Sequence, residues 1–157
     1  MSTSPARYWQ HECDAMKRIA VFTIDDCIFG ADTAFVHDII PPGPLLKIPQ
    51  RTEQYFGNVA QLEDSRFIHV INTEKLLGLE NLPIGAASRL IVVQAPSFTM
   101  GLLVDKVIKL VDTGSDALRP NLPITGIRSD FLKGIVTDQE TVIIILDMDM
   151  IVQTLGS

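Results

Sequence analysis

The chain has 157 residues, a formal net charge of −6 and an apolar fraction of 46%. This length suits one compact unit, or two very small units that share a core. Without a cluster of Lys and Arg there is no basic surface to bind nucleic acid, and no apolar run approaches the roughly 20 residues that cross a bilayer. We therefore expect neither nucleic-acid binding nor direct membrane insertion.

The N-terminal segment 1–17 lacks the apolar stretch of a secretory signal, so we expect a flexible lead-in and a cytoplasmic protein. Cys13 and Cys27 form no Cys-x-x-Cys pair, which predicts ordinary thiols in a reducing compartment.

Short runs rich in β-branched and aromatic residues, separated by Gly, Pro, Asp and Asn, predict strands along the chain. In chain order the predicted strands are 18–24, 27–31, 66–71, 90–95, 99–104, 107–111 and 141–146. Asp25-Asp26 and Pro96-Ser97 are expected to form tight hairpin turns, and short helices are expected after Asn72 and Asp147.

The chain repeats itself. RIAVFTIDDCIFG (18–30) and RLIVVQAPSFTMG (89–101) match at an offset of 71 residues, as from Arg18 to Arg89. NVAQLEDSRFIHVIN (58–72) resembles GIVTDQETVIIILD (134–147) at offsets of 76 and 75. We infer an all-β fold of two similar packed units, each a small barrel that hides its own edges. The expected division of the β fold, 18–157, is a first unit over about 18–87, a second over about 88–146 and a short C-terminal helix over 147–155.

Two carboxylates follow the predicted strand 141–146. Asp147 and Asp149, with Glu140, could hold a divalent ion in a hydrolase. The repeat favours another role, because Asn72 stands where Asp147 does and both residues are good N-caps. We expect Asn72 and Asp147 to be structural caps, and we keep the metal-dependent hydrolase as an alternative.

No other residues assemble a catalytic site. The three histidines are isolated, and the chain has neither a Gly-x-Ser-x-Gly elbow nor a Gly-rich phosphate loop. Asp105 lies in an apolar run, where it sits at a bulge or binds a backbone group. A ligand-binding sensor is a third hypothesis, although aromatics make up only 6% of the chain. The residues favour a non-enzymatic β module with no catalytic residue, cofactor or metal.

Five sequence blocks, in their order and spacing, resemble the CheW-like family of bacterial chemotaxis coupling proteins. The blocks are FGADTAFVHDII (29–40), KIP (47–49), MGLLVDKVIKLV (100–111), FLKGIV (131–136) and VIIILDMDMIV (142–152). The resemblance covers about Arg18 to Leu155 and implies two packed five-stranded, SH3-like barrels. It also implies an adaptor at membrane-associated receptor arrays, which couples the cytoplasmic tip of a chemoreceptor to the regulatory domain of a histidine autokinase in chemotaxis or motility signalling.

The same resemblance implies two partner surfaces. Carried over by motif position, the receptor groove would comprise Val36, Asp38, Ile39, Gln61, Leu62 and Glu63. A kinase-facing set would comprise Gly101, Leu102 and Asp105, in a block that also suits the core.

One block departs from the family pattern. The family commonly shows Gly-Val-x-Asn-Leu-Arg-Gly where this chain has NVAQLED at 58–64. Glu63 therefore reverses a charge, and Asp64 adds a second acid. Two interpretations stay open: a working coupler that has drifted in sequence, or a divergent member with altered partners in a separate motility system.

Overall fold

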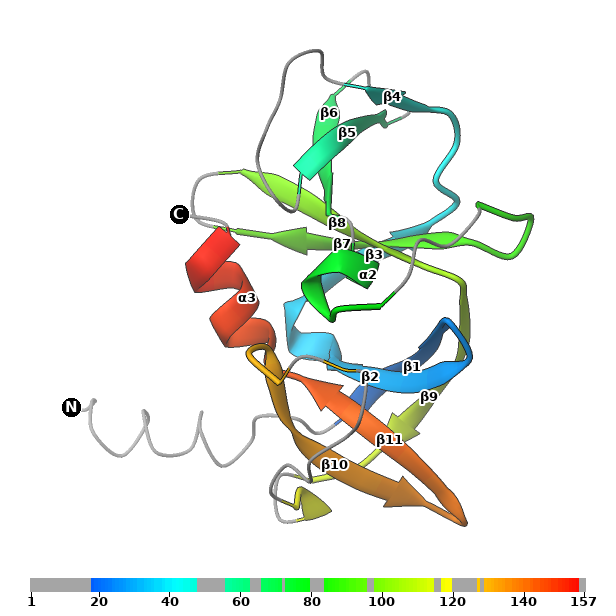
Figure 1. The fold of residues 1–157 in the computed structure, drawn as a ribbon, viewed down its shortest axis with the longest axis vertical. Coiled ribbons are helices and arrows are strands. Elements are labelled where there is room, and N and C mark those ends of the chain that lie inside the picture. Colours follow the sequence, from blue (N-terminus) through cyan, green and yellow to red (C-terminus); the bar gives the residue numbers. More distant parts are fainter. Residues whose placement is uncertain are drawn as a thin grey trace, which may run out of the picture.

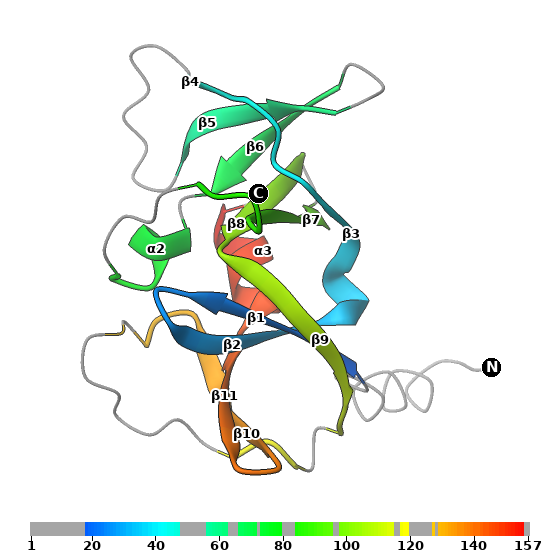
Figure 2. The same cartoon turned by 90° about the vertical axis from the view of Figure 1, so that its right-hand side faces the viewer.

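The structure is a computed structural model that describes residues 18–47, 56–62, 66–71, 73–79, 84–95, 98–114, 117–119, 127 and 129–155. Within these residues the chain forms two curved sheets with short helices between them (Figures 1 and 2). The strands are β1 (Arg18–Ile24), β2 (Cys27–Asp32), β3 (Val36–Ile40), β4 (Leu45–Lys47), β5 (Phe56–Gln61), β6 (Phe67–Ile71), β7 (Arg89–Gln94), β8 (Thr99–Val104), β9 (Lys106–Asp112), β10 (Leu132–Asp138) and β11 (Thr141–Leu146). The helices are η1 (Thr33–Phe35), α2 (Thr73–Leu76) and α3 (Met148–Leu155).

The seven predicted strands are all present, with small differences at their ends, and β3, β4, β5 and β10 were not predicted. The β1–β2 turn has the expected hairpin geometry, because Asp25 and Asp26 both have positive φ, 51° and 65°. Strands β7 and β8 also pair as a hairpin, and the turn predicted at Pro96-Ser97 lies outside the described residues.

Sheet A has the strand order β10-β11-β2-β1-β9, and sheet B has the order β3-β7-β8-β6-β5-β4. The expected all-β fold of two packed units is confirmed. The expected barrel closure is corrected: among the described strands, pairing gives open sheets of five and six strands.

The two sheets repeat each other in register as well as in strand order. Gly30 of β2 pairs with Ile145 of β11, and the equivalent Gly101 of β8 pairs with Val70 of β6. Bulges recur at the same repeat position in β1–β9 and β3–β7, and again in β10–β11 and β5–β6. Both glycines are tightly packed: an added Cβ would lie 3.0 Å from the Ile143 side chain at Gly30, and 3.3 Å from a neighbouring side chain at Gly101.

Each sheet draws strands from both repeats. Sheet B is built from consecutive strands, β3 to β8, whereas sheet A combines β1 and β2 with β9, β10 and β11. The two repeats therefore exchange their first hairpins: β1 and β2 pair with β9 and β11 of the second repeat, and β7 and β8 pair with β3 and β6 of the first. The sequence boundary near residue 87 consequently does not coincide with the division between the sheets.

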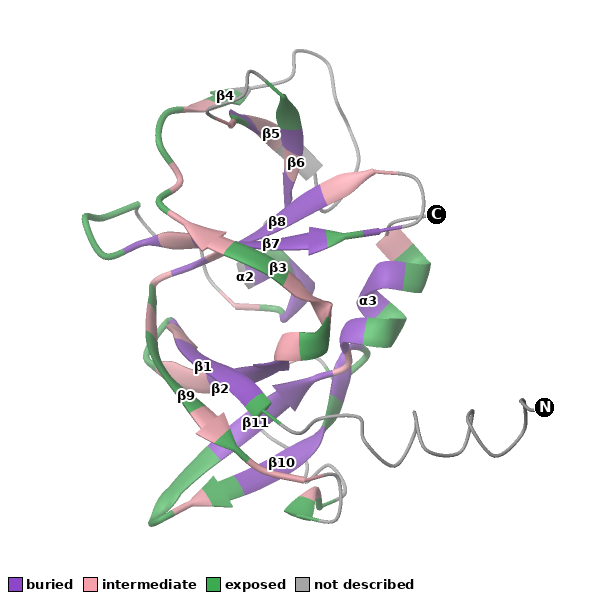
Figure 3. Cartoon of the chain, turned by 180° about the vertical axis from the view of Figure 1, so that it is seen from behind, coloured by how far each residue is buried: buried purple, intermediate pink, exposed green. Residues whose placement is uncertain are grey.

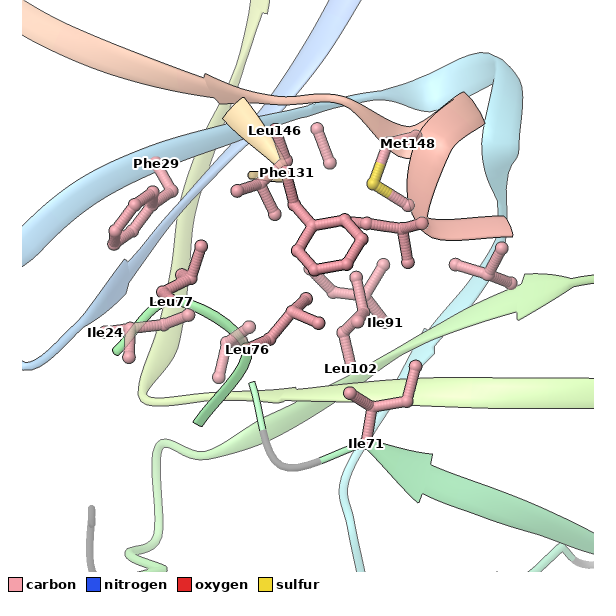
Figure 4. Packing of buried hydrophobic residues seen from close by; sticks show 14 of the residues in the cluster. Ile24, Phe29, Ile71, Leu76, Leu77, Ile91, Leu102, Phe131, Leu146 and Met148 are labelled. Atoms are coloured by element: carbon pink, nitrogen blue, oxygen red, sulfur yellow. The ribbon is translucent and has the colours of Figure 1, made fainter. Parts of the chain in front are cut away.

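Three apolar clusters hold this arrangement together. The largest lies between the sheets and includes residues of both, of α2 and of α3 (Figure 4). Each sheet also has a cluster of its own, and these two clusters correspond residue for residue through the repeat. They comprise Ile19, Val21, Val136, Ile143 and Ile145 in sheet A, and Leu90, Val92, Ala60, Ile68 and Val70 in sheet B.

Contacts other than strand pairing hold the two edges of sheet A together. Its two outermost strands meet through an ion pair of 2.8 Å between Lys109 Nζ on β9 and Asp138 Oδ2 on β10. Beyond β10, Arg119 and Ile135 form a β-bridge with reciprocal backbone hydrogen bonds of 2.9 and 3.0 Å. These contacts bring the edges of sheet A together.

Candidate functional site

Asp147 and Asp149 are engaged in starting helix α3. Asp147 Oδ1 accepts a hydrogen bond of 3.0 Å from the backbone N–H of Met150, the geometry of an N-cap. Asp149 Oδ2 accepts a hydrogen bond of 3.0 Å from Gln153 Nε2, one turn later. Asn72, the expected cap in the other repeat, lies outside the described residues.

The hydrolase alternative also fails on distance. Glu140 and Asp147 flank opposite ends of β11, and a six-residue strand spans about 20 Å. A single ion bridges ligands only a few ångströms apart. Among the described residues, no group of three or more His, Cys, Asp or Glu could hold a metal ion. The carboxylates around β11 therefore do not form a metal centre in this part of the chain.

Cys27 is not an activated nucleophile. Its side chain packs against the shared core. Burial, and then the negative charges of Asp25 and Asp26, raise the pKa of the Cys27 thiol above its ordinary value. A raised pKa lowers the thiolate fraction, and the thiolate is the reactive form.

The structure has a groove of about 570 Å³ in sheet B. We call it the sheet B groove. Its floor is apolar and includes the buried residues Val92 and Ala60. Its walls comprise His37, Asp38, Ile40, Pro41, Pro42, Gly43, Gln61, Leu62, Arg66, Gln94 and Thr99. An apolar floor with a few polar groups at the rim is typical of a recognition site.

The rim offers both fixed and available polar groups. Thr99 Oγ1 donates a hydrogen bond of 2.8 Å to Gln94 Oε1, so these two side chains hold each other. Asp38 Oδ1 accepts a 2.8 Å hydrogen bond from the backbone N–H of Ile39, which orients the carboxylate. No described residue pairs with the other oxygen of Asp38 or with the amide of Gln61, so both face solvent.

The groove brings together three of the six residues expected at the receptor surface. Asp38, Gln61 and Leu62 all line it. Val36 and Ile39 instead pack against the core between the sheets, on the opposite face of β3. Glu63 lies outside the described residues.

The residues expected to face a kinase have mainly structural roles. Gly101 is buried, and Leu102 is fully buried in the shared core, so neither presents a side chain to a partner. Asp105 was expected either at a bulge or bound to a backbone group, and it has a backbone partner. Its Oδ2 accepts a 3.0 Å hydrogen bond from the backbone N–H of Asp25. We do not carry Gly101 and Leu102 into any proposed contact surface.

Sequence reasoning did not identify Arg66, Gln94 or Thr99 as groove residues. One signal was available in the repeat, because Thr99 occupies the place of Ile28. Ile28 packs against the cluster inside sheet A, whereas Thr99 is polar and bonds to a rim residue. A polar residue at an apolar repeat position could have marked the groove.

A second exposed surface follows β9, at the edge of sheet A. Ile108 and Leu110 are 44% and 54% exposed. Figure 3 shows β9 and β3, the edge strands of the two sheets, on the same face of the molecule. Exposed apolar residues along an unpaired edge are typical of a protein contact surface.

Within the described residues, no helix is long and apolar enough to cross a membrane. The model of the CheW-like domain family matches residues 18–156. Among solved structures, the crystal structure of the scaffolding protein TtCheW from Thermoanaerobacter tengcongensis is similar, with a TM-score of 0.73 and 28% sequence identity; the match covers 83% of each chain. Comparison with curated proteins gives no match.

Proposed function

Because this chain belongs to the CheW-like family, whose model matches residues 18–156, we propose that it is a cytoplasmic adaptor that couples chemoreceptors to a histidine autokinase. The family is one of non-enzymatic scaffolds, and the similar solved structure is of a scaffolding protein. The extent of the family match is the observation that carries this proposal.

The shape of the molecule supports an adaptor role. A coupling protein needs at least two separate contact surfaces, and the exposed edge of β9 and the sheet B groove lie on different sheets. Both have apolar centres with polar groups around them, as protein contact surfaces have. We assign the receptor tip to the groove side, through Asp38, Gln61 and Leu62, and the kinase regulatory domain to another surface.

A divergent coupler with altered partners is the second candidate. The observation that favours it is the acidic pair Glu63 and Asp64, where the family commonly has arginine and glycine. A reversed charge at the rim of an interface changes the choice of partner more than it changes the fold.

The test is reconstitution with partners from the same cell. We would measure binding of the full chain to soluble receptor tips and to each histidine kinase regulatory domain by calorimetric titration. We would then measure kinase autophosphorylation with receptor-bearing membranes. We expect binding to both partners and a higher autophosphorylation rate when the protein is added; absence of binding to any receptor or kinase would overturn the proposal.

A matched pair of variants locates the β9 surface. Leu110→Glu places a charge on the exposed edge of β9, whereas Val142→Glu places one on β11 at a side chain that is also about half exposed, 50%. We expect Leu110→Glu to weaken binding of one partner at least tenfold and Val142→Glu to leave both affinities nearly unchanged. Equal losses in both variants would show that β9 is not a specific contact surface.

A further inference from the structure

The repeat shows why sheet B has a groove at this place. The ion pair that ties the edges of sheet A, Lys109–Asp138, corresponds in sheet B to Asp38 and Leu62 at offsets of 71 and 76 residues, as from Arg18 to Arg89 and from Asn58 to Gly134. Asp38 and Leu62 cannot form an ion pair, because leucine carries no charge. Both Asp38 and Leu62 line the groove instead.

A third replacement in the repeat acts in the same direction. Ile28 packs against the interior cluster of sheet A, whereas its equivalent Thr99 turns its hydroxyl to Gln94 at the groove rim. The side chain that helps to fill one sheet is thus smaller and polar in the other. Sheet B therefore keeps an open apolar floor, with an acid at its edge, where sheet A has an ion pair of its own.

The carboxylate of Asp38 is oriented so that it can bind a cation. Its Oδ1 is fixed by the N–H of Ile39 at 2.8 Å, and no described cation pairs with it. Arg66 also lines the groove, but it is engaged in an interaction of its own. An oriented carboxylate next to an apolar floor attracts a cation that carries an aliphatic stem, because the stem covers the floor while the charge stays at the rim.

We infer that the sheet B groove binds an extended protein segment that presents a Lys or Arg side chain to Asp38 and an adjacent aliphatic side chain to the floor at Val92 and Leu62. The chain itself provides the template, since Lys109 makes the corresponding ion pair at the equivalent place in sheet A.

The groove favours a peptide segment over a compact small molecule. It lies against β3, which is the outermost strand of sheet B and has no neighbour on its other side among the described strands. Side-chain pockets next to an open strand edge are a common arrangement for extended segments. Pro41 and Pro42 form part of the wall, and their fixed φ angles lower the entropic cost of ordering the groove on binding. This inference concerns the site assigned to a partner under the proposed function, and it rests on that function only for the identity of the partner.

The test uses short synthetic peptides and the full chain labelled with ¹⁵N. The first peptide has the sequence Ser-Leu-Val-Lys-Leu-Ser with blocked ends; in the second, norleucine replaces the lysine, and in the third, glutamate does. We expect the lysine peptide to shift the amide signals of Asp38, Gln61 and Gln94. We also expect it to bind at least fivefold more tightly than the norleucine peptide and at least tenfold more tightly than the glutamate peptide. Raising the salt concentration should reduce this preference, because salt screens exposed charges.

Two variants test the residues. Asp38→Asn keeps the size of the side chain, and we expect it to remove the preference for lysine over norleucine. Asp38→Lys combined with Leu62→Asp introduces the ion pair of sheet A into sheet B, and we expect it to abolish the shifts. An unchanged spectrum outside the groove controls for folding in each variant.

Three results would overturn the inference: equal binding of the three peptides, shifts confined to another surface, or an unchanged lysine preference in Asp38→Asn. Failure of the proposed function would look different. The lysine peptide would then bind in the groove, while no receptor tip or kinase domain bound the chain.

Discussion

The carboxylate of Asp105 and the backbone N–H of Asp25 meet at 3.0 Å, which joins the β8–β9 connection to the turn of the β1–β2 hairpin. The backbone N–H of Asp105 also donates to the carbonyl of Thr23, at 2.9 Å. The other repeat has neither side of the first contact, because Ala34 stands at the position of Asp105 and Pro96, which lacks an N–H, stands at that of Asp25.

Asp105→Ala should lower the free energy of unfolding by about 1–2 kcal/mol, because the turn loses an acceptor for a backbone N–H. Asp105→Asn keeps an acceptor oxygen and removes a charge close to Asp25, so we expect it to be nearly as stable as wild type. Urea denaturation measures both variants. If the two variants lose the same amount, the hydrogen bond is not the cause.

Asp147→Ala should cost about 1 kcal/mol, because the N–H of Met150 loses its acceptor at the start of α3. Asp147→Asn should be nearly silent, since asparagine caps as well as aspartate does. Thermal or chemical unfolding of the pair checks this expectation. An asparagine variant as damaged as the alanine variant would contradict the capping role.

Gly134→Ala should destabilise the protein by about 1–3 kcal/mol through overpacking. An added Cβ at Gly134 would collide with the backbone carbonyl oxygen of Arg119, which bonds to Ile135. Gly85→Ala is the matched control, because nothing lies within 4 Å of an added Cβ there. Chemical denaturation should show a lower free energy of unfolding for Gly134→Ala than for Gly85→Ala. Similar values would show that the backbone at Arg119 moves to accommodate the added Cβ at little cost in stability.

Cys27 should react with iodoacetamide only at higher pH than an ordinary thiol. Burial and the charges of Asp25 and Asp26 raise its pKa, so at any given pH the folded protein has less of the reactive thiolate than the unfolded chain in urea. Asp26→Asn removes one of these charges and should move the rate profile to lower pH. Peptide mapping by mass spectrometry distinguishes Cys27 from Cys13. A folded profile that coincided with the unfolded one would contradict the assignment.

Glu63→Arg should strengthen binding to the receptor tips or kinase regulatory domain of a standard chemotaxis array by about 1–2 kcal/mol, because it removes a like-charge contact at the rim. This expectation rests on the sequence, as Glu63 lies outside the described residues. Calorimetric titration at low and high ionic strength measures it. Loss of binding to the chain's own kinase, with no gain for standard partners, would favour the divergent coupler.

The hairpins could be predicted from the sequence because their signals are local. Asp25 and Asp26 interrupt a nearly continuous apolar run, and two such residues suit a turn with positive φ. β3 and β10 were missed because polar residues or glycine stand at their bulges, at His37-Asp38 and Lys133-Gly134, whereas β9 was predicted because its equivalent bulge has the apolar Ile108. In β10 the pairing shifts between Leu132 and Gly134, so Lys133 is an extra residue and the alternation is lost.

The same kind of bulge explains why the residues expected at the receptor surface lie on two faces of β3. Motif position placed Val36 and Ile39 with Asp38 on one surface. The pairing shift at His37 turns Val36 and Ile39 together toward the shared core and leaves Asp38 on the groove side. The exchange of the hairpins β1–β2 and β7–β8 between the repeats could not be predicted from the sequence either, because it depends on pairing between strands such as β1 and β9 that are far apart in the chain.

The exchange of hairpins between the repeats sets an order of events during synthesis on the ribosome. Every strand of sheet B has been made once Val104 is added, whereas β1 and β2 remain without β9, β10 and β11 until Leu146 is added. The roughly 40 intervening residues take several seconds to translate at about 5–20 residues per second. During that time the apolar faces of β1 and β2 lack their partners, so these strands are covered later than the strands of sheet B although they are made earlier. Chaperones that bind nascent chains should therefore protect β1 and β2 more than any other strands.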